Sequence, residues 1–379
     1  MQDLALYIHW PFCVSKCPYC DFNSHVRKSI DEDAWQQALE QELKRAIDQA
    51  PNRRLVSIFF GGGTPSLMPP HIVAALIDRA TKSWRVEPNI EITLEANPNS
   101  VEVAKFAELR AAGVNRVSLG IQSLIAEDLK QLGRAHSVDE AKQAIAVAQA
   151  NFERVSIDLI YTRQQQALAS WQQELQQALS FGTDHMSLYQ LTIEPGTAYH
   201  TLHARGDLQI PKEEQAAEFY EQTGKMMQAA GLPTYEISNY AKPGQESRHN
   251  LQYWRYRDYV GIGPGAHGRI TINDNKYATK QYRAPETWLT QVASGSGEQQ
   301  RELLSKADQQ SEALMMGLRL VEGIDISSLP LPLELQAERW QQVIEAGYAI
   351  VEDKRLKLSD SGRIRLNAIL AYVLDNQLD

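Results

Sequence analysis

The most constraining feature of this chain is a group of three cysteines within eight residues, Cys13, Cys17 and Cys20, and the chain has no other cysteine. Their spacing is Cys-x3-Cys-x2-Cys, directly after a short apolar run. A cubane [4Fe–4S] cluster takes thiolate ligands at its irons. Three thiolates leave one iron free to bind a substrate, as a catalytic zinc ion keeps one position open. The spacing therefore predicts a [4Fe–4S] cluster bound by these cysteines.

Other uses of the cysteines fit less well. An odd number of crowded cysteines argues against a disulfide framework. A zinc site would need a fourth ligand, for which His9 or His25 is available, and the first spacing is unusual for zinc. A zinc-binding scaffold therefore stays an alternative, which a colourless purified protein would support.

Charge and hydropathy bound the kind of protein. The 379 residues include 38 basic and 47 acidic residues, for a net charge of −9, which disfavours a dedicated nucleic-acid binder. The first residues lack the basic and apolar regions of a signal peptide. No apolar run approaches the roughly 20 residues of a membrane span. Because an exposed cluster also needs a reducing compartment, we expect a cytoplasmic protein without a transmembrane segment.

Strand-like and helical patterns alternate in the first half of the chain. The strand-like runs are short and apolar, as strands buried on both faces are, whereas the helical segments repeat an apolar residue about every fourth position. Six βα units predict a parallel sheet with helices outside it. We expect strands at 4–10, 55–60, 90–96, 116–122, 155–160 and 185–191, and helices at 31–49, 71–83, 101–112, 137–150 and 169–181.

The unusual residues lie at or just past the carboxyl ends of these strands. The cysteines follow the first strand, Gly61-Gly62-Gly63-Thr64 the second, and Glu95 and Gln122 close the third and fourth. A doubly wound sheet fits the alternation too. A barrel, however, gathers its active site at the carboxyl ends of its strands, so this placement favours a barrel-like arrangement.

The rest of the chain predicts two further parts. Residues 193–300 are less regular and hold a helix near 212–231 and a dense aromatic stretch. Residues 301–379 predict helices near 309–321 and 334–346, a small hairpin around 353–355 and a last helix from Ser361, the order of a winged-helix-like domain. We therefore divide the chain into residues 1–192, 193–300 and 301–379.

The cysteine spacing is that of the radical S-adenosylmethionine (SAM) superfamily. Over nearly its whole length the chain resembles the family of oxygen-independent coproporphyrinogen III oxidases and their haem-chaperone relatives. The resemblance implies an α/β fold, a partial (β/α)6 TIM-type barrel of the radical SAM type. It also implies that SAM is bound by Tyr7, Tyr19, Gly62, Gly63, Thr64, Glu95, Gln122, Arg134 and Asp158.

The chain departs from this family in one loop. Where the family continues past the Asp-Leu segment with Gly-Leu-Pro, this chain has Thr162-Arg163-Gln164. A loop built on glycine and proline has become one without either. The path of this loop, and any second ligand bound there, cannot be carried over from the family.

Three features separate the two branches of the family. The oxidase branch carries a further cysteine two residues after the third cluster cysteine, where this chain has Phe22, and a long arm ahead of the cluster, where this chain has twelve residues. The third feature is His249-Asn250-Leu251-Gln252-Tyr253-Trp254, which matches the HNxxYW signature of the haem-chaperone branch. All three favour the chaperone branch.

The resemblance implies a haem site at the HNxxYW segment. A neutral imidazole is a good axial iron ligand, so His249 is the expected ligand, with Tyr253 and Trp254 as flat apolar surface for the porphyrin. His267, in the following glycine-rich loop, is the second candidate. Arg255, Arg257 or Arg269 could pair with the haem propionates.

The sequence thus supports two functions of different classes. The first is a haem chaperone that binds a [4Fe–4S] cluster, SAM and haem and delivers haem to acceptor proteins. The second is an enzyme, an oxygen-independent coproporphyrinogen III oxidase. The expected partners are haem, haem-acceptor proteins and an electron donor for the cluster, and a homodimer is compatible with the sequence.

Overall fold

The computed structural model, which describes residues 1–374, is built on a sheet of 11 strands. The strand order is β13-β12-β11-β10-β1-β4-β5-β6-β7-β8-β9, and the six strands from β1 to β8 in this order run parallel. These six are β1 (Asp3–Trp10), β4 (Arg54–Gly62), β5 (Arg85–Ala96), β6 (Arg116–Gln122), β7 (Arg154–Tyr161) and β8 (His185–Gln190). The predicted partial barrel is confirmed.

The segment 193–300 lengthens this sheet at both edges. Strand β10 pairs parallel with β1, and β11, β12 and β13 continue from it as antiparallel strands. At the opposite edge β9 pairs antiparallel with β8. Their bounds are β9 (Asn239–Ala241), β10 (Tyr259–Ile262), β11 (His267–Ile272), β12 (Asn275–Gln281) and β13 (Glu298–Leu303). The curved sheet is therefore open, with β13 and β9 as its edge strands. The domain boundaries given above stay predictions.

Successive side chains of a strand point to opposite faces, and the two faces of this sheet differ in polarity. In β1, Leu4, Leu6 and Ile8 are fully buried in the main apolar core. Tyr7, which has the opposite parity, lies against the ring of His249 on the inner face, 6.4 Å away. The outer face thus supplies the core, and the inner face supplies polar groups.

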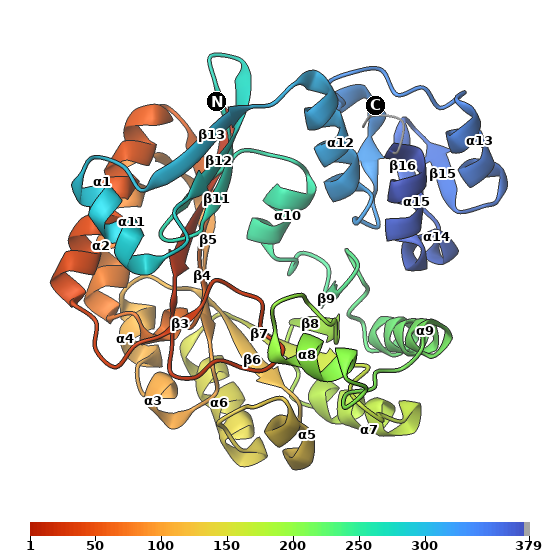
Figure 1. The fold of residues 1–379 in the computed structure, drawn as a ribbon, viewed down its shortest axis with the longest axis horizontal. Helices are drawn as coiled ribbons and strands as arrows, with labels where there is room; N and C mark the ends of the chain where they lie inside the picture. Colours follow the sequence, from red (N-terminus) through yellow and green to blue (C-terminus); the bar gives the residue numbers. More distant parts are fainter. Residues whose placement is uncertain (375–379) are drawn as a thin grey trace.

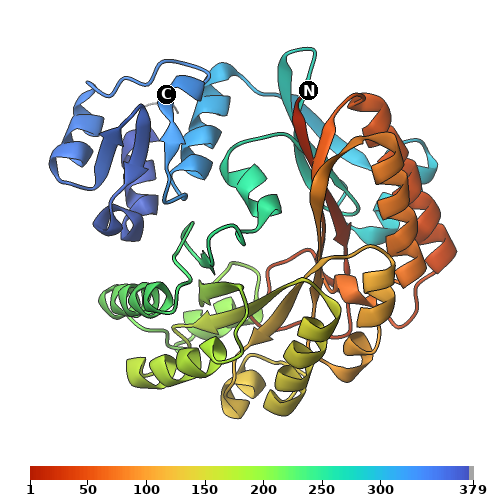
Figure 2. The ribbon, with the colours of Figure 1, turned by 180° about the vertical axis from the view of Figure 1, so that it is seen from behind.

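Most helices of the first 300 residues cover the outer face of the curved sheet, as Figures 1 and 2 show. The predicted helix 101–112 consists of two short helices, α3 and α4, and α5, α8 and α11 were not predicted. The helices are α1 (Glu32–Gln49), α2 (Pro70–Ser83), α3 (Ser100–Val103), α4 (Phe106–Ala111), α5 (Ala126–Gln131), α6 (Val138–Asn151), α7 (Leu168–Leu179), α8 (Ala198–Ala204), α9 (Glu213–Ala229) and α11 (Pro285–Ala293).

Helix α10 (Arg248–Trp254) lies on the inner side of the sheet, between it and the C-terminal part of the chain (Figure 1). Ser247 caps the helix by accepting a hydrogen bond from the amide of Asn250. The buried carboxylate of Glu91 on β5 accepts two more, from the amides of Arg248 at 3.1 Å and His249 at 3.0 Å. A negative group at a helix N-terminus is favourable, so Glu91 fixes where α10 begins.

The C-terminal part has an apolar core of its own. Its sheet has the order β14-β16-β15, and Asp353 and Lys354, both with positive φ, turn the hairpin from β15 to β16. The elements are α12 (Lys306–Gly317), β14 (Ile324–Asp325), α13 (Glu338–Glu345), β15 (Ala349–Glu352), β16 (Arg355–Leu358), α14 (Asp360–Ile364) and α15 (Leu366–Leu374). This agrees with the predicted helices and hairpin. The remaining short elements are β2 (Phe12–Cys13), β3 (His25–Val26) and two 3₁₀ turns, 65–67 and 326–328.

Candidate functional site

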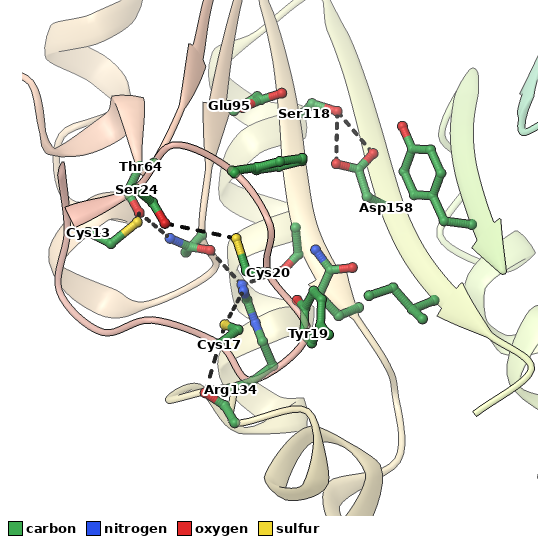
Figure 3. A pocket seen from close by; sticks show the side chains of 18 of the residues that line it. Cys13, Cys17, Tyr19, Cys20, Ser24, Thr64, Glu95, Ser118, Arg134 and Asp158 are labelled. Carbon is green, nitrogen blue, oxygen red and sulfur yellow. Dashed lines mark hydrogen bonds between the residues drawn. The ribbon is translucent and has the colours of Figure 1, made fainter. Parts of the chain in front are cut away.

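A cavity of about 850 Å³ opens at the carboxyl ends of the parallel strands. Figure 3 shows the three cysteines toward one end of it and Glu95, Ser118 and Asp158 toward the other. Most of the predicted site residues line it, although they come from six separate segments of the chain. They are Cys13, Cys17, Tyr19, Cys20, Gly62, Gly63, Thr64, Glu95, Gln122, Arg134 and Asp158.

The three thiols lie on the loop that follows β1, and each has a polar neighbour. Thr64 Oγ1 donates to Cys13 Sγ at 3.3 Å, Arg134 Nη1 donates to Cys17 Sγ at 3.5 Å, and the Ser24 hydroxyl lies 3.9 Å from Cys20 Sγ. Burial is the main reason that the pKa values of Cys13 and Cys20 are raised. Without a metal these thiols keep their protons, and metal binding displaces them.

This donor set fits a [4Fe–4S] cluster. Among residues 1–374, no group of three or more Cys, His, Asp or Glu side chains is arranged around a single metal ion. In a cubane each thiolate binds a different iron, so the three sulfurs need not converge on one point. Three thiols that line one pocket meet that requirement, and a cluster held by them would keep one iron without a protein ligand.

The glycine loop that ends β4 packs its backbone against the cysteine loop. The amides of Gly63 and Thr64 donate to the carbonyls of Trp10 and Phe12, at 2.7 and 2.8 Å. A Cβ on Gly63 would lie 2.7 Å from the Phe12 carbonyl oxygen and 3.0 Å from Cys13 Sγ, closer than side-chain carbons approach. The glycine at 63 is therefore required by contact with the cysteine loop itself.

Two half-buried carboxyls, Glu95 and Asp158, lie at the other end of the cavity. Burial, and next the charge of Asp158, raise the pKa of Glu95 to about 8. Burial also raises the pKa of Asp158, against hydrogen bonds from Ser187 and Ser118, and the Ser118 hydroxyl donates to it at 3.0 Å. An opposite charge nearby favours the ionised form of a carboxyl, so this end of the cavity suits a ligand with a cationic group.

Arg134 connects the cysteine loop with two strand ends. Besides Cys17, its guanidinium donates to the Gly120 carbonyl at 2.8 Å and to the side chain of Asn97. Asn97 in turn donates to Thr64 Oγ1 at 3.1 Å. Gln122, which ends β6 with a φ of 65°, also lines the cavity.

The polar lining residues that sequence reasoning did not select include Asn97 and Ser118. Ser118 sits in a predicted strand, four residues before Gln122, and both line the cavity. Asn97 stands in the quoted run Glu95-Ala96-Asn97, just past its strand end. Strand parity, applied to all residues rather than to the charged ones, could have found Ser118.

Tyr7 does not line the cavity, although the resemblance implied a SAM contact for it. Its hydroxyl is hydrogen-bonded to Nδ1 of His9, 3.0 Å away, and its ring stacks against Phe59. In this structure Tyr7 therefore contacts its own strand and its neighbour.

His249 and Tyr253 do not line the cavity either. They lie on α10, on the inner side of the sheet. The His249 side chain is buried, with the residue 1% exposed, and its two ring nitrogens are hydrogen-bonded to Ser57 Oγ at 2.9 Å and to the Tyr253 hydroxyl at 2.6 Å. Burial is the main reason that the pKa of His249 falls to about 3. The imidazole is thus neutral, the form that binds iron, but both nitrogens are engaged.

Trp254 lines a second cavity, of about 620 Å³, between the barrel and the C-terminal part. The three arginines that could pair with haem propionates each face a carboxylate: Arg255 pairs with Glu322, Arg257 with Asp3, and Arg269 with Glu312.

His267, the second candidate ligand, is exposed at the start of β11. Burial of part of the ring, and next the charges of Lys280, Arg269 and Arg283, lower its pKa.

The loop that departs from the family is held by buried charges. Thr162 has a φ of 56°, which is unusual for a β-branched residue. Arg163 is buried and pairs with Glu174 on α7 and with Asp128 on α5, at 2.7 Å for the latter. The arginine thus replaces the family's rigid backbone with side-chain contacts to two helices.

Within residues 1–374, no helix is long and apolar enough to cross a membrane.

Comparisons with known proteins agree with this geometry. Residues 7–164 match the radical SAM superfamily, and residues 304–365 match the HemN C-terminal domain. In a solved structure, coproporphyrinogen III oxidase HemN from Escherichia coli superposes with a TM-score of 0.82 at 21% identity, covering 99% of this chain and 91% of that chain. At this identity the likeness shows the fold alone.

Curated relatives are similar over most or all of their length. The heme chaperone HemW of Escherichia coli (strain K12) is 36% identical, with 99% of both chains covered. The mitochondrial radical S-adenosyl methionine domain-containing protein 1 of Bos taurus is 38% identical, over 98% of this chain and 88% of that protein. The chain therefore belongs to the radical SAM superfamily, in the family that includes these two proteins.

Proposed function

We propose that this protein is a haem chaperone, which binds haem and passes it to acceptor proteins, and which also binds a [4Fe–4S] cluster and SAM. The observation that carries the proposal is the HNxxYW segment on α10, in a chain whose full-length bacterial relative at 36% identity is named heme chaperone HemW. The predicted cytoplasmic location, electron donor and homodimer belong to the same proposal.

The large cavity supports the binding of both cofactors. Cys13, Cys17 and Cys20 would hold the cluster, which when reduced supplies one electron. Among the other lining residues, the backbone of Gly62 and Gly63 and the carboxyls of Glu95 and Asp158 would hold SAM, the carboxyls suiting its cationic groups. Because a positive charge nearby favours the ionised carboxyls, a cationic ligand would bind here in preference to a neutral one.

His249 stays the proposed iron ligand, with Tyr253 and Trp254 beside the porphyrin. Ligation requires that His249 exchange one of its two hydrogen bonds for iron, and so that α10 shift. One observation supports such a shift: within residues 1–374, the buried Gln252 Oε1 and Trp254 Nε1 of this helix have no hydrogen-bond partner. Unsatisfied buried groups make the present position of α10 less stable than a fully paired one.

Alanine variants separate the two candidate iron ligands, His249 and His267. His249→Ala should shift the Soret band of the haem-loaded protein and weaken haem binding, while Tyr253→Ala and Trp254→Ala should weaken binding without changing the Soret position. If His249→Ala leaves spectrum and affinity unchanged and His267→Ala alters them, the exposed His267 is the ligand.

The alternative function is that of an oxygen-independent coproporphyrinogen III oxidase. The cavity supports it as well, because the three cysteines and most of the residues proposed to bind SAM line it. Against it stands Phe22, at the position of the oxidase branch's extra cysteine. This side chain is 59% exposed and borders the cavity that holds the cluster cysteines.

One incubation separates the two functions. The reconstituted protein is supplied under anaerobic conditions with coproporphyrinogen III, SAM and a reductant, and the porphyrins are separated by chromatography. We expect unchanged coproporphyrinogen III. Protoporphyrinogen formed at more than one equivalent per chain would assign the oxidase function instead.

A further inference from the structure

The glycine-rich loop of residues 261–268 joins β10 to β11 and contributes nothing to the lining of either cavity. It lies against the cysteine loop, which comes much earlier in the chain. One side chain is hydrogen-bonded to the glycine-rich loop: Nδ2 of Asn23 donates to the carbonyl of Pro264 at 2.9 Å, and also to the carbonyl of Arg283, beyond the loop, at 3.0 Å.

The glycine loop is shaped to this side chain. Gly265 has a φ of 75°, and a Cβ there would lie 2.6 Å from Nδ2 of Asn23. Its amide donates to the Tyr282 carbonyl at 2.8 Å, so the loop is held from behind as well. A side chain on Gly265 would displace the Asn23 amide from both of its acceptors.

The backbone of Asn23 is held from the other side by His9. Nε2 of His9 lies 2.9 Å from the Asn23 carbonyl oxygen, which can only accept, so Nε2 carries the proton. Burial is the main reason that the pKa of His9 is lowered to about 4, so the ring is neutral and Nδ1 accepts from the Tyr7 hydroxyl. A chain of hydrogen bonds thus runs from Tyr7, on the inner face of the sheet, through His9 to Asn23.

We propose that Asn23 is a positioning residue for the cluster, which fixes the cysteine loop between His9 on β1 and the glycine loop at 261–268. Asn23 lies three residues after Cys20, and its Oδ1 is 3.2 Å from Nε2 of His25, next to the short β2–β3 pair that closes the cysteine loop. The loop that carries all three thiols is therefore held three residues after its last thiol.

Asn23→Asp is the sharpest test because it preserves shape. The new carboxylate cannot donate, and one of its oxygens would face two carbonyl oxygens in place of the amide. Asn275→Asp adds the same charge at the exposed hairpin between β11 and β12 and serves as the matched control. Both variants are made in the full chain and compared with the wild type.

Three measurements follow. In the apoprotein, trypsin should cut after Lys16, in the cysteine loop, roughly tenfold faster in Asn23→Asp than in the control, since two hydrogen bonds are lost. The thermal midpoint should fall by only about 2–4 °C relative to the control, because a tenfold change corresponds to about 1.4 kcal/mol. After reconstitution, anaerobic release of iron to a chelator should accelerate by a similar factor. The EPR spectrum of the reduced cluster should change less on addition of SAM than in the wild type.

Two results would overturn the proposal. If trypsin cleavage and iron release both match those of Asn275→Asp, Asn23 does not position the loop. If Asn23→Asp and the uncharged Asn23→Ala both fail to fold as apoproteins, Asn23 serves the whole fold rather than the cysteine loop. Neither result depends on haem binding, so the proposed function is tested separately.

Discussion

The cysteine residues carry the most direct prediction at the scale of single side chains. Changing Cys13, Cys17 or Cys20 to Ala should abolish stable cluster binding, because two thiolates rarely hold a cubane. The chain should still fold, since the apolar core lies between the sheet and its outer helices rather than in this loop. Iron and sulfide analysis of the reconstituted variants is the measurement, and about four of each per chain in a single-cysteine variant would refute the assignment.

Glu95 carries a pH prediction. Its pKa is about 8 in the folded protein, above the ordinary value of 4.5, so the folded state binds a proton more tightly than the unfolded state. Its contribution to stability is therefore fully present below pH 4.5 and is lost as the pH rises through about 8. The loss amounts to at most about 5 kcal/mol, from the size of the shift.

Glu95→Gln removes this titration. We expect the variant to gain stability relative to the wild type between pH 5 and pH 8, measured as the difference in free energy of unfolding of the two apoproteins at each pH. A difference that stays constant across this range would show that Glu95 does not titrate there.

At the scale of elements, the loop after β7 offers a test of its buried ion pair. Arg163→Met removes the partner of the buried Glu174, which also accepts from the Ser123 hydroxyl at 2.6 Å and the Leu124 amide at 2.7 Å. An uncompensated buried carboxylate destabilises a protein by about 3–5 kcal/mol.

The double variant Arg163→Met/Glu174→Gln should recover part of that loss, because the glutamine side chain is neutral and its oxygen still accepts from Ser123 and Leu124. Urea unfolding of the two single variants and the double variant gives the coupling energy. Additive effects in the two positions would mean that the pair does not hold the loop.

The six parallel strands from β1 to β8 could be predicted from the sequence, and the strands added at the two edges of the sheet could not. Strand β7 was expected at 155–160 and spans Arg154–Tyr161, because a strand buried on both faces is a visible apolar run. Strand β13 is Glu298–Leu303, a polar and mostly exposed segment that carries no such pattern. The position of β13 is set by its pairing with β12, and a local sequence pattern does not show which strands pair.

The site divides in the same way. Residues at strand ends, such as Glu95 and Gln122, could be assigned because parallel strands bring their carboxyl ends together. The surroundings of Tyr7 could not, because strand parity shows that a side chain points inward but not what meets it there. Those of His249, on a helix, depend on contacts with distant strands. Helix α10 is anchored by Glu91, which lies 158 residues before His249 in the chain.

At the scale of the whole molecule, the central claim is that this radical SAM fold binds haem as cargo. In the C-terminal part, α12 contacts α10. Residues of the C-terminal part also line the second cavity together with Trp254. A shift of α10 toward that cavity would release His249 from Ser57. Haem binding and the position of α10 are therefore expected to be coupled.

The most direct test is an equilibrium titration of the anaerobically reconstituted full chain with haem, followed by the Soret band. We predict saturation at one haem per chain, with a band that shifts in His249→Ala. Absorbance that rises without saturation, and equally in wild type and in the His249→Ala/His267→Ala double variant, would contradict a specific haem site and with it the chaperone function.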